Sequence, residues 1–226
     1  MGANLGPNIV TDGLVLTLDA GNKNSYAGSG TNWYDLSGNG NNGTLTNGPT
    51  FSSTNLGSIV FDGVNDYLTL PSVTLNTNTG FTIDMWIYIN DPQPVYSNFW
   101  SYWLNIGGNG GFEWGVYANT GSQGIFLVKD SGASGGPTVT SSYVGNQWAN
   151  IIFGCNLTIP FLYTNGTLSG TANNFRNTNI TITEILRGSS RYFKANQASI
   201  KFYNRSLSSQ EVLQNYNATK TRFGLT

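Results

Sequence analysis

Apolar and polar residues alternate along most of this chain, most clearly over Phe81–Ile89, where five apolar residues share one face. Successive side chains of a β-strand point to opposite faces, so this period of two predicts strands that bury one face. The other runs of this kind cover residues 14–19, 59–61, 67–70, 99–106, 112–118, 125–129, 148–155, 161–164, 180–186 and 198–203. So many short strands predict an all-β fold of two packed antiparallel sheets.

Turn residues stand between these runs. Pairs of Asn and Gly recur there, and both residues tolerate the positive φ angles of tight turns. The pair Asn165-Gly166 lies between Phe161–Thr164 and Thr167-Leu168, and this arrangement predicts a tight β-hairpin.

Only one segment indicates a helix. Ser208 and Glu211 have the spacing of a capping box, and the apolar residues at 207 and 212 are placed to form a hydrophobic staple. We expect Val212, Leu213 and Tyr216 to face the sheet over about two turns. The polar residues 220–226 that follow are expected to be loose or to dock on a neighbouring molecule.

The charge of the chain limits its partners. Charged residues make up 9% of the 226 residues, and ten Lys and Arg against eleven Asp and Glu give a net charge of −1. Nucleic acids and anionic membranes attract a dense basic surface, so we expect neither as a partner. A nearly neutral surface offers little repulsion between copies, which favours a homo-oligomer or an array of many copies.

The chain has one cysteine, Cys155, and no histidine. An intramolecular disulfide, a Cys-His pair, a Ser-His-Asp triad and histidine-bound zinc are therefore excluded. Cys155 ends the apolar run Ile151–Cys155, so we interpret it as a small core residue. The first residues lack the basic and apolar segments of a secretory signal, and we expect synthesis in a cytoplasm.

Several motifs, in a fixed order, resemble one known family. They are Trp33–Thr44 (WYDLSGNGNNGT), Ile59–Tyr67 (IVFDGVNDY), Phe81–Trp86 (FTIDMW) and Ile200–Val212 (IKFYNRSLSSQEV). Together they resemble the laminin G-like, concanavalin A-like lectin/glucanase superfamily. The resemblance implies a concanavalin A-like jelly-roll sandwich with one short C-terminal helix. We expect an N-terminal arm at 1–12, the sandwich domain at 13–217 and a C-terminal tail at 218–226.

The N-terminal third resembles a narrower group. Thr11–Leu16 and Asp19–Asn22, leading to the tryptophan motif, are similar to standalone domains of tailed bacteriophages, which are virion components. This resemblance implies a non-enzymatic virion structural protein, expected as a capsid decoration protein at the virion surface. Its partners would be the capsid shell or sibling subunits. The alternative is a carbohydrate-binding adhesin that recognises host surface polysaccharide from a fibre or from the head.

Two loop motifs have a structural interpretation. In the loop after Trp33 and Tyr34, Asp35 is placed to cap backbone N–H groups while the two rings anchor the loop to the sandwich. In the second motif, Asp62, Asn65 and Asp66 are expected to tie a corner between two strands. Calcium is the alternative there, but the D-x-[DN]-x-[DN]-G pattern is missing, so no metal or other cofactor is expected.

Catalysis is not expected. Glucanases of the resembled superfamily carry acidic residues two apart on one strand, in the style of E-x-D-x-E. Glycoside hydrolysis needs two carboxyl groups about 5–9 Å apart, and residues i and i+2 share a strand face. Here Glu113, Glu184 and Glu211 are isolated from one another. We therefore predict a binding protein and not a hydrolase.

A sugar-binding or interface role would fall first on Trp100, Tyr102 and Trp103, because aromatic rings stack on sugar C–H faces. Burial in the core is the structural alternative. The loop expected to correspond to the calcium site of related lectins, Ser131–Gly136, has no acidic residue beyond Asp130, which disfavours calcium-mediated binding. The only cluster of basic residues is Arg187, Arg191 and Lys194, interpreted as a solvated face or a contact with an acidic neighbour.

Overall fold

The structure is a computed structural model that describes residues 7–90, 100–106, 112–117, 123–130, 138–172, 179–188 and 190–226. Side chains are described for all of these except residues 100–106, 112–117, 123–130, 138 and 140–144. The described chain is mostly β-strand, with one α-helix near its C-terminus. The expected all-β fold with one short C-terminal helix is thus confirmed.

The described strands form three hydrogen-bonded sheets. The first contains β1 (Leu14–Asp19), β4 (Thr50–Ser52), β5 (Ser58–Asp62), β7 (Phe81–Ile89), β12 (Trp148–Asn156), β13 (Ile159–Thr164), β14 (Thr167–Thr171) and β18 (Lys194–Tyr203). Their order is β14-β13-β12-β7-β18-β5-β4, and β1 also pairs with β18. The second sheet, in the order β15-β6-β3-β2, contains β2 (Asn32–Trp33), β3 (Gly43–Thr46), β6 (Tyr67–Asn76) and β15 (Asn179–Ile185).

The third sheet continues from the second. It contains β8 (Trp100–Ile106), β9 (Phe112–Tyr117), β10 (Gln123–Asp130), β11 (Thr138–Val144), β16 (Arg187–Gly188) and β17 (Arg191–Tyr192), in the order β11-β10-β9-β8-β16-β17. Only β8 and β16 pair in parallel; the other described pairs are antiparallel. At the far edge of this sheet, β11 contacts β13 and β14 of the first sheet.

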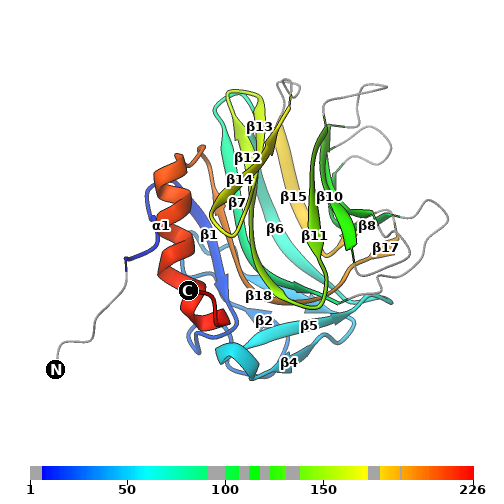
Figure 1. Cartoon of the computed structure of the whole chain (residues 1–226). Helices are drawn as coiled ribbons and strands as arrows, with labels where there is room; N and C mark the ends of the chain where they lie inside the picture. The colour runs from blue at the N-terminus through cyan, green and yellow to red at the C-terminus, as the bar shows by residue number, and fades with distance from the viewer. Residues whose placement is uncertain are drawn as a thin grey trace.

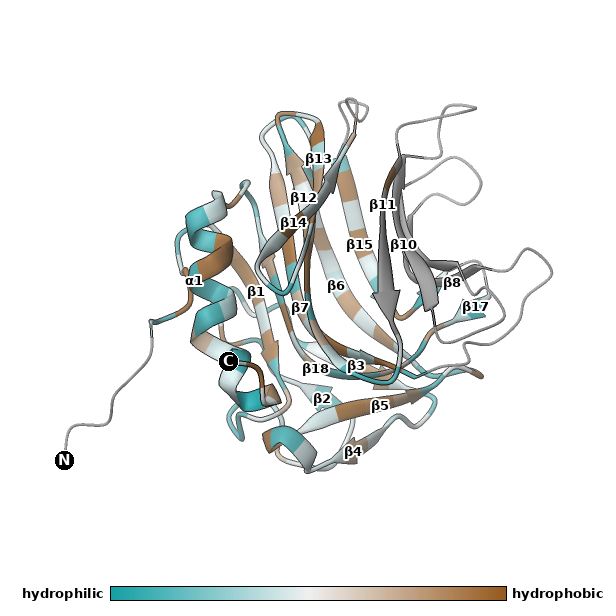
Figure 2. Cartoon of the chain, viewed as in Figure 1, coloured by the Kyte–Doolittle hydropathy of each residue, from teal (hydrophilic) through white to brown (hydrophobic). Residues whose placement is uncertain are grey.

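The core lies between the first sheet and the second. Ile83 of β7 and Phe202 of β18 belong to one buried cluster with Leu68 of β6 and Ile182 of β15. Apolar and polar bands alternate along β6 and β15 in Figure 2, as expected for strands with one buried face. Helix α1 (Ser209–Thr219) lies on the side of the molecule away from β15 and β8 (Figure 1) and contacts β7 and β18 of the first sheet through Asn215.

Helix α1 begins as the sequence predicts. The side chain of Ser208 accepts from the backbone N–H of Glu211, and Ser208 N–H donates to Glu211, which completes a capping box. Val212 is buried, and Leu207 lies in the same cluster. The expectation for Leu213 is wrong: it is 47% exposed, and Asn215 is buried instead. The helix therefore points Asn215 toward the sheet, where its side-chain amide donates to Asp84 and to the hydroxyl of Tyr203.

Two local predictions are confirmed. Asn165 and Gly166 have φ angles of 50° and 75° and connect β13 to β14 in a two-residue turn. Cys155 is fully buried in the core, where its thiol donates a weak hydrogen bond to the carbonyl oxygen of Thr77. Burial raises the pKa of this thiol to about 11.

The C-terminal residues dock on their own chain. The 3-10 helix η3 (Lys220–Phe223) follows α1 directly and places Phe223 against the ring of Trp86. Arg222 forms an ion pair with Asp19 at the end of β1. Among the described helices, none has the length and apolar character that crossing a membrane requires.

Candidate functional site

The outer face of the second sheet carries hydroxyl and amide side chains. β3 buries every other residue, and β6 and β15 do so on either side of a shift in register, so the remaining side chains point away from the core. Those of this outer face are Thr44, Thr46, Thr69, Thr74, Asn76, Asn179, Thr181 and Thr183. The hydroxyls of Thr46 and Thr69 lie 3.2 Å apart, those of Thr74 and Thr181 lie 3.1 Å apart, and Asn76 donates to Asn179. The face presents ordered donors and acceptors to solvent.

An aromatic and charged cluster lies at one end of this face. Tyr67 begins β6, Tyr192 ends β17, and their ring centroids are 6.5 Å apart. The guanidinium carbon of Arg187 lies 4.8 Å from the Tyr67 ring centroid and 5.8 Å from that of Tyr192. Arg187 also donates to Glu184 at 3.1 Å. The guanidinium of Arg187, held by its ion pair with Glu184, keeps both partly exposed tyrosine rings in place at the surface.

The strand with the predicted aromatic residues lies beside this cluster. Trp100, Tyr102 and Trp103 belong to β8, and β8 pairs with β16 through Leu104 and Arg187. The side chains of these three residues lie outside the described part of the structure. The loop Ser131–Gly136 also lies outside the described residues. A sugar or interface role for these aromatic residues stays a prediction.

The predicted basic cluster is divided by the fold. Arg187 and Arg191 lie on the paired strands β16 and β17, whereas Lys194 begins β18 in the first sheet. Arg187 is the member that contacts the tyrosine pair.

The carboxylates of the motif after β5 bind the backbone. Asp62 accepts from the N–H groups of Val64 and Asn65, and Asp66 accepts from the N–H of Asp62. Asp66 is 4% exposed, and burial raises the pKa of its carboxyl group against the lowering effect of that hydrogen bond. These bonds shape the passage from β5 in the first sheet to β6 in the second. Within the described residues, no group of three or more His, Cys, Asp or Glu side chains is arranged to hold a metal ion.

The tryptophan motif closes the open edge of β1. Asp35 accepts from the backbone N–H groups of Thr17, Ser37 and Asn41, so one carboxylate shapes the loop and joins it to β1. Trp33 is fully buried, as expected of an anchor. Tyr34 is 45% exposed, so the expectation that it also anchors the loop is wrong. An edge strand covered in this way is protected from pairing with other chains.

Sequence reasoning missed Tyr67, Glu184 and Tyr192 as site residues. Polar and apolar residues alternate from Tyr67 to Leu70, and this pattern predicts that the Tyr67 ring points outward. No spacing in the sequence relates position 67 to position 192, because only the passage from β15 through β16 and β17 brings them together.

The family comparison agrees with this fold. Residues 62–213 match the model of the concanavalin A-like lectin/glucanases superfamily, so the chain belongs to this family of β-sandwich proteins. The resemblance drawn from the sequence motifs is confirmed. Among curated proteins, no sequence matches this one significantly.

Several solved structures share this fold. Domain 4 of AbnA, an extracellular arabinanase from Geobacillus stearothermophilus, solved with arabinotriose, is 13% identical with a TM-score of 0.65, and the match covers 90% of this chain and 98% of that one. The binding domain of Paraclostridial Mosquitocidal Protein 1 is 17% identical with a TM-score of 0.62, covering 92% and 52%. The receptor-binding domain of botulinum neurotoxin type G is 17% identical with a TM-score of 0.61, covering 91% and 51%. The chain thus spans about half the length of these toxin domains.

Proposed function

We propose that this protein is a non-enzymatic carbohydrate-binding domain that recognises a polysaccharide on the outer face of the second sheet. The observation that carries the proposal is the cluster of Tyr67, Arg187 and Tyr192 beside a face of ordered hydroxyl and amide groups. Two structural neighbours support it by their described roles, one solved with arabinotriose and one a receptor-binding domain.

The chemistry of the face suits a sugar chain. Tyrosine rings offer a flat apolar surface for the C–H side of a sugar and a hydroxyl for its edge. Within the described residues Arg187 uses one nitrogen on Glu184, and a guanidinium has five N–H donors with which it can also meet sugar hydroxyls. Thr and Asn side chains along β3, β6 and β15 extend the polar surface over the length of several strands. A face of this extent suits an extended ligand.

The placement of the acids supports binding without catalysis. Ion pairs with basic side chains engage Asp12, Asp19, Asp84, Glu184 and Glu211. Backbone N–H groups engage the other three described carboxylates, those of Asp35, Asp62 and Asp66. Each of these eight side-chain carboxylates thus has a contact that accounts for it within the fold. Glycoside hydrolysis instead uses a pair of carboxyl groups, one as general acid and one as nucleophile or base.

The virion role is a separate part of this proposal. It rests on the resemblance of Thr11–Leu16 and Asp19–Asn22 to phage virion domains and on the net charge of −1, which allows many copies to pack closely. A decoration protein that also binds host polysaccharide would combine both roles. Mass spectrometry of dissociated virions should find the protein in many copies, and its presence only in infected-cell lysate would contradict the virion role.

Binding can be tested with paired variants. We expect the protein to bind one or more polysaccharides on a glycan array, and Tyr192→Ala to weaken that binding by about tenfold or more. Leu213→Ala removes an exposed side chain of α1, on the other side of the sandwich, and serves as the control. Trp100→Ala tests whether β8 extends the site. Absence of binding to every polysaccharide, or equal loss in Leu213→Ala and Tyr192→Ala, would contradict the proposed site.

A further inference from the structure

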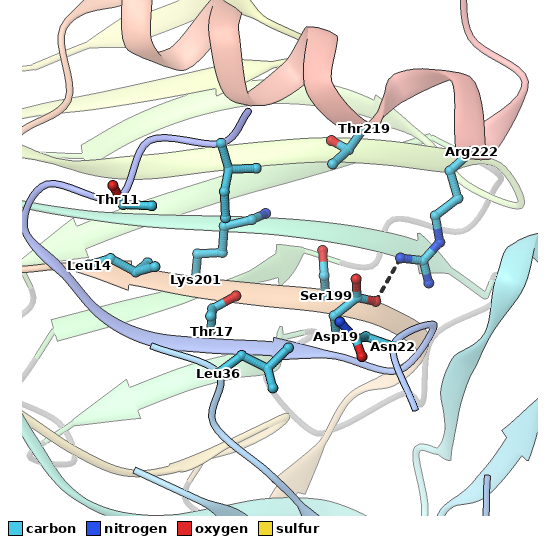
Figure 3. A pocket seen from close by; sticks show the side chains of 11 residues that line it. Thr11, Leu14, Thr17, Asp19, Asn22, Leu36, Ser199, Lys201, Thr219 and Arg222 are labelled. Atoms are coloured by element: carbon cyan, nitrogen blue, oxygen red, sulfur yellow. Dashed lines mark hydrogen bonds and ion pairs between the residues drawn. The ribbon is translucent and has the colours of Figure 1, made fainter. Parts of the chain in front are cut away.

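We infer that the protein has a second ligand site, in a pocket under α1, that binds one neutral polyhydroxylated molecule of the size of a single sugar unit. The pocket has a volume of about 270 Å³. Strands β1 and β18 form its floor, and the segments before β1 and after α1 close its sides (Figure 3). It lies on the opposite side of the sandwich from Tyr67 and Tyr192, so this inference is independent of the proposed function.

Two hydroxyl groups on the pocket floor make no hydrogen bond to the residues that the structure describes. Thr17 on β1 and Ser199 on β18 alternate with the core residues Leu16 and Ile200, so their side chains point away from the core toward α1. Both residues are more than nine-tenths buried, at 8% and 4% exposure. Within the described part of the chain, neither hydroxyl makes a hydrogen bond. Both residues line the pocket, so their hydroxyls can exchange hydrogen bonds with an occupant that supplies donors and acceptors.

An ammonium group reaches the same space. The side chain of Lys201 is 5% exposed, and its nitrogen donates to Asp84 at 3.4 Å. This is its one hydrogen bond among the described residues, although an ammonium carries three N–H donors. Figure 3 shows the nitrogen pointing into the region between β18 and the helix. It can therefore donate to a ligand hydroxyl without leaving Asp84.

The charges around the pocket are balanced, which selects a neutral ligand. Lys201 is paired with Asp84, and Arg222 is paired with Asp19 at 2.7 Å. Arg222 also donates to the carbonyl oxygens of Asn55 and Gly57, so its donors are engaged in the fold. A carboxylate placed here would have no unpaired cation to meet and would lie near two existing carboxylates. A neutral polyol keeps its hydrogen bonds without that repulsion.

The shape and lining fit a single ring. Pockets for drug-sized ligands span about 300–1,000 Å³, so a pocket of about 270 Å³ is at the lower limit and holds no extended chain. Leu14 and Leu36 add apolar surface beside the hydroxyls (Figure 3). A sugar ring has hydroxyls at its edge and C–H groups on its faces. The hydroxyls match the polar part of the pocket lining, and the C–H groups match the leucine side chains.

The test measures binding of simple sugars by nuclear magnetic resonance of the full chain. D-glucose, D-galactose, L-arabinose and myo-inositol are the neutral probes, and D-glucuronate and D-galacturonate are the acidic probes. We expect at least one neutral probe to shift the amide signals of Thr17 and Ser199, with a Kd of about 1 mM. The corresponding acid should bind about tenfold more weakly or not at all.

Conservative variants locate the binding. Thr17→Val and Ser199→Ala remove one hydroxyl each without disturbing a hydrogen bond among the described residues. Each variant should raise the Kd of the neutral probe by about fivefold. Thr50→Val, on an exposed position of β4, is the matched control and should bind as the wild type does. Leu36→Trp, at the 39% exposed rim, should block the pocket.

Three results would overturn the inference. These are the absence of shifts at Thr17 and Ser199 with all neutral probes, equal or tighter binding of the acids, and unchanged binding in Thr17→Val and Ser199→Ala. Tyr192→Ala separates the two sites: it should leave these shifts intact while weakening polysaccharide binding. Loss of the sugar shifts in Tyr192→Ala would assign them to the sheet face and remove the pocket as a site.

Discussion

The rings of Trp86 and Phe223 stack with centroids 4.1 Å apart and planes inclined by 15°. Trp86 lies on the outer face of β7 and Phe223 in the C-terminal 3-10 helix, so this contact attaches the end of the chain to the middle of the first sheet. The indole N–H of Trp86 donates to the hydroxyl of Thr219 at 2.7 Å. The last turn of α1 and η3 are therefore part of the folded domain.

Removal of this stack should destabilise the whole domain. Phe223 is 7% exposed, and we expect Phe223→Ala to lower the free energy of unfolding by about 3 kcal/mol, because a large buried ring leaves a cavity. Urea denaturation followed by tryptophan fluorescence measures the change. Leu213→Ala, at a 47% exposed helix position, is the control and should stay within about 0.5 kcal/mol of wild type. Equal effects of the two variants would show that η3 contributes no stability.

A buried ion pair under α1 gives a second prediction. Asp84 and Lys201 have side-chain exposures of 1% and 5%, and Asp84 also accepts from Asn150 and Asn215. Asp84→Ala should cost about 3–5 kcal/mol, since it leaves the ammonium of Lys201 buried without a counter-charge. Adding Lys201→Met should recover part of that loss. Chemical denaturation of both variants tests this, and a double variant less stable than Asp84→Ala would contradict it.

Acid should weaken the start of α1. The hydrogen bond from Arg205, together with the bonds of the capping box, lowers the pKa of Glu211 from 4.5 to about 2. The ionised carboxylate therefore stabilises the fold above about pH 4.5, and this contribution is lost as the pH falls from 4.5 toward 2. Unfolding free energies at neutral pH and at about pH 3 should differ more for the wild type than for Glu211→Gln, which retains a capping-box residue. An identical pH dependence of the two proteins would contradict this role.

Cys155 should be unreactive until the protein unfolds. Burial raises the pKa of its thiol to about 11, so thiolate is scarce at neutral pH and the sulfur is also inaccessible. A coloured disulfide reagent should label the native protein slowly and the urea-unfolded protein rapidly. Fast labelling under native conditions would show that β12 opens locally. Cys155→Ser, which lacks a thiol, gives the background rate.

Some hydrogen bonds of polar side chains could be predicted from the local sequence. Asp35 was placed correctly as a backbone cap because two of its three partners, Ser37 and Asn41, lie within a few residues. The capping box of Ser208 and Glu211 follows from a spacing of three. The exposure of Leu213 could not be predicted in this way. The buried position belongs to Asn215 because Asp84 and the hydroxyl of Tyr203, distant in sequence, supply its hydrogen-bond partners.

The amino-acid sequence alone determined the class of fold: strand alternation, Asn-Gly turns and the family motifs depend on neighbouring residues and survive any change of context. The tertiary structure decided the sites. Tyr67 meets Arg187 and Tyr192, and Thr17 meets Ser199 and Lys201, only because strands far apart in the chain pair or pack together. Hydrogen bonds and ring contacts act over a few ångströms, and no local pattern in a sequence records which distant residues come within that range.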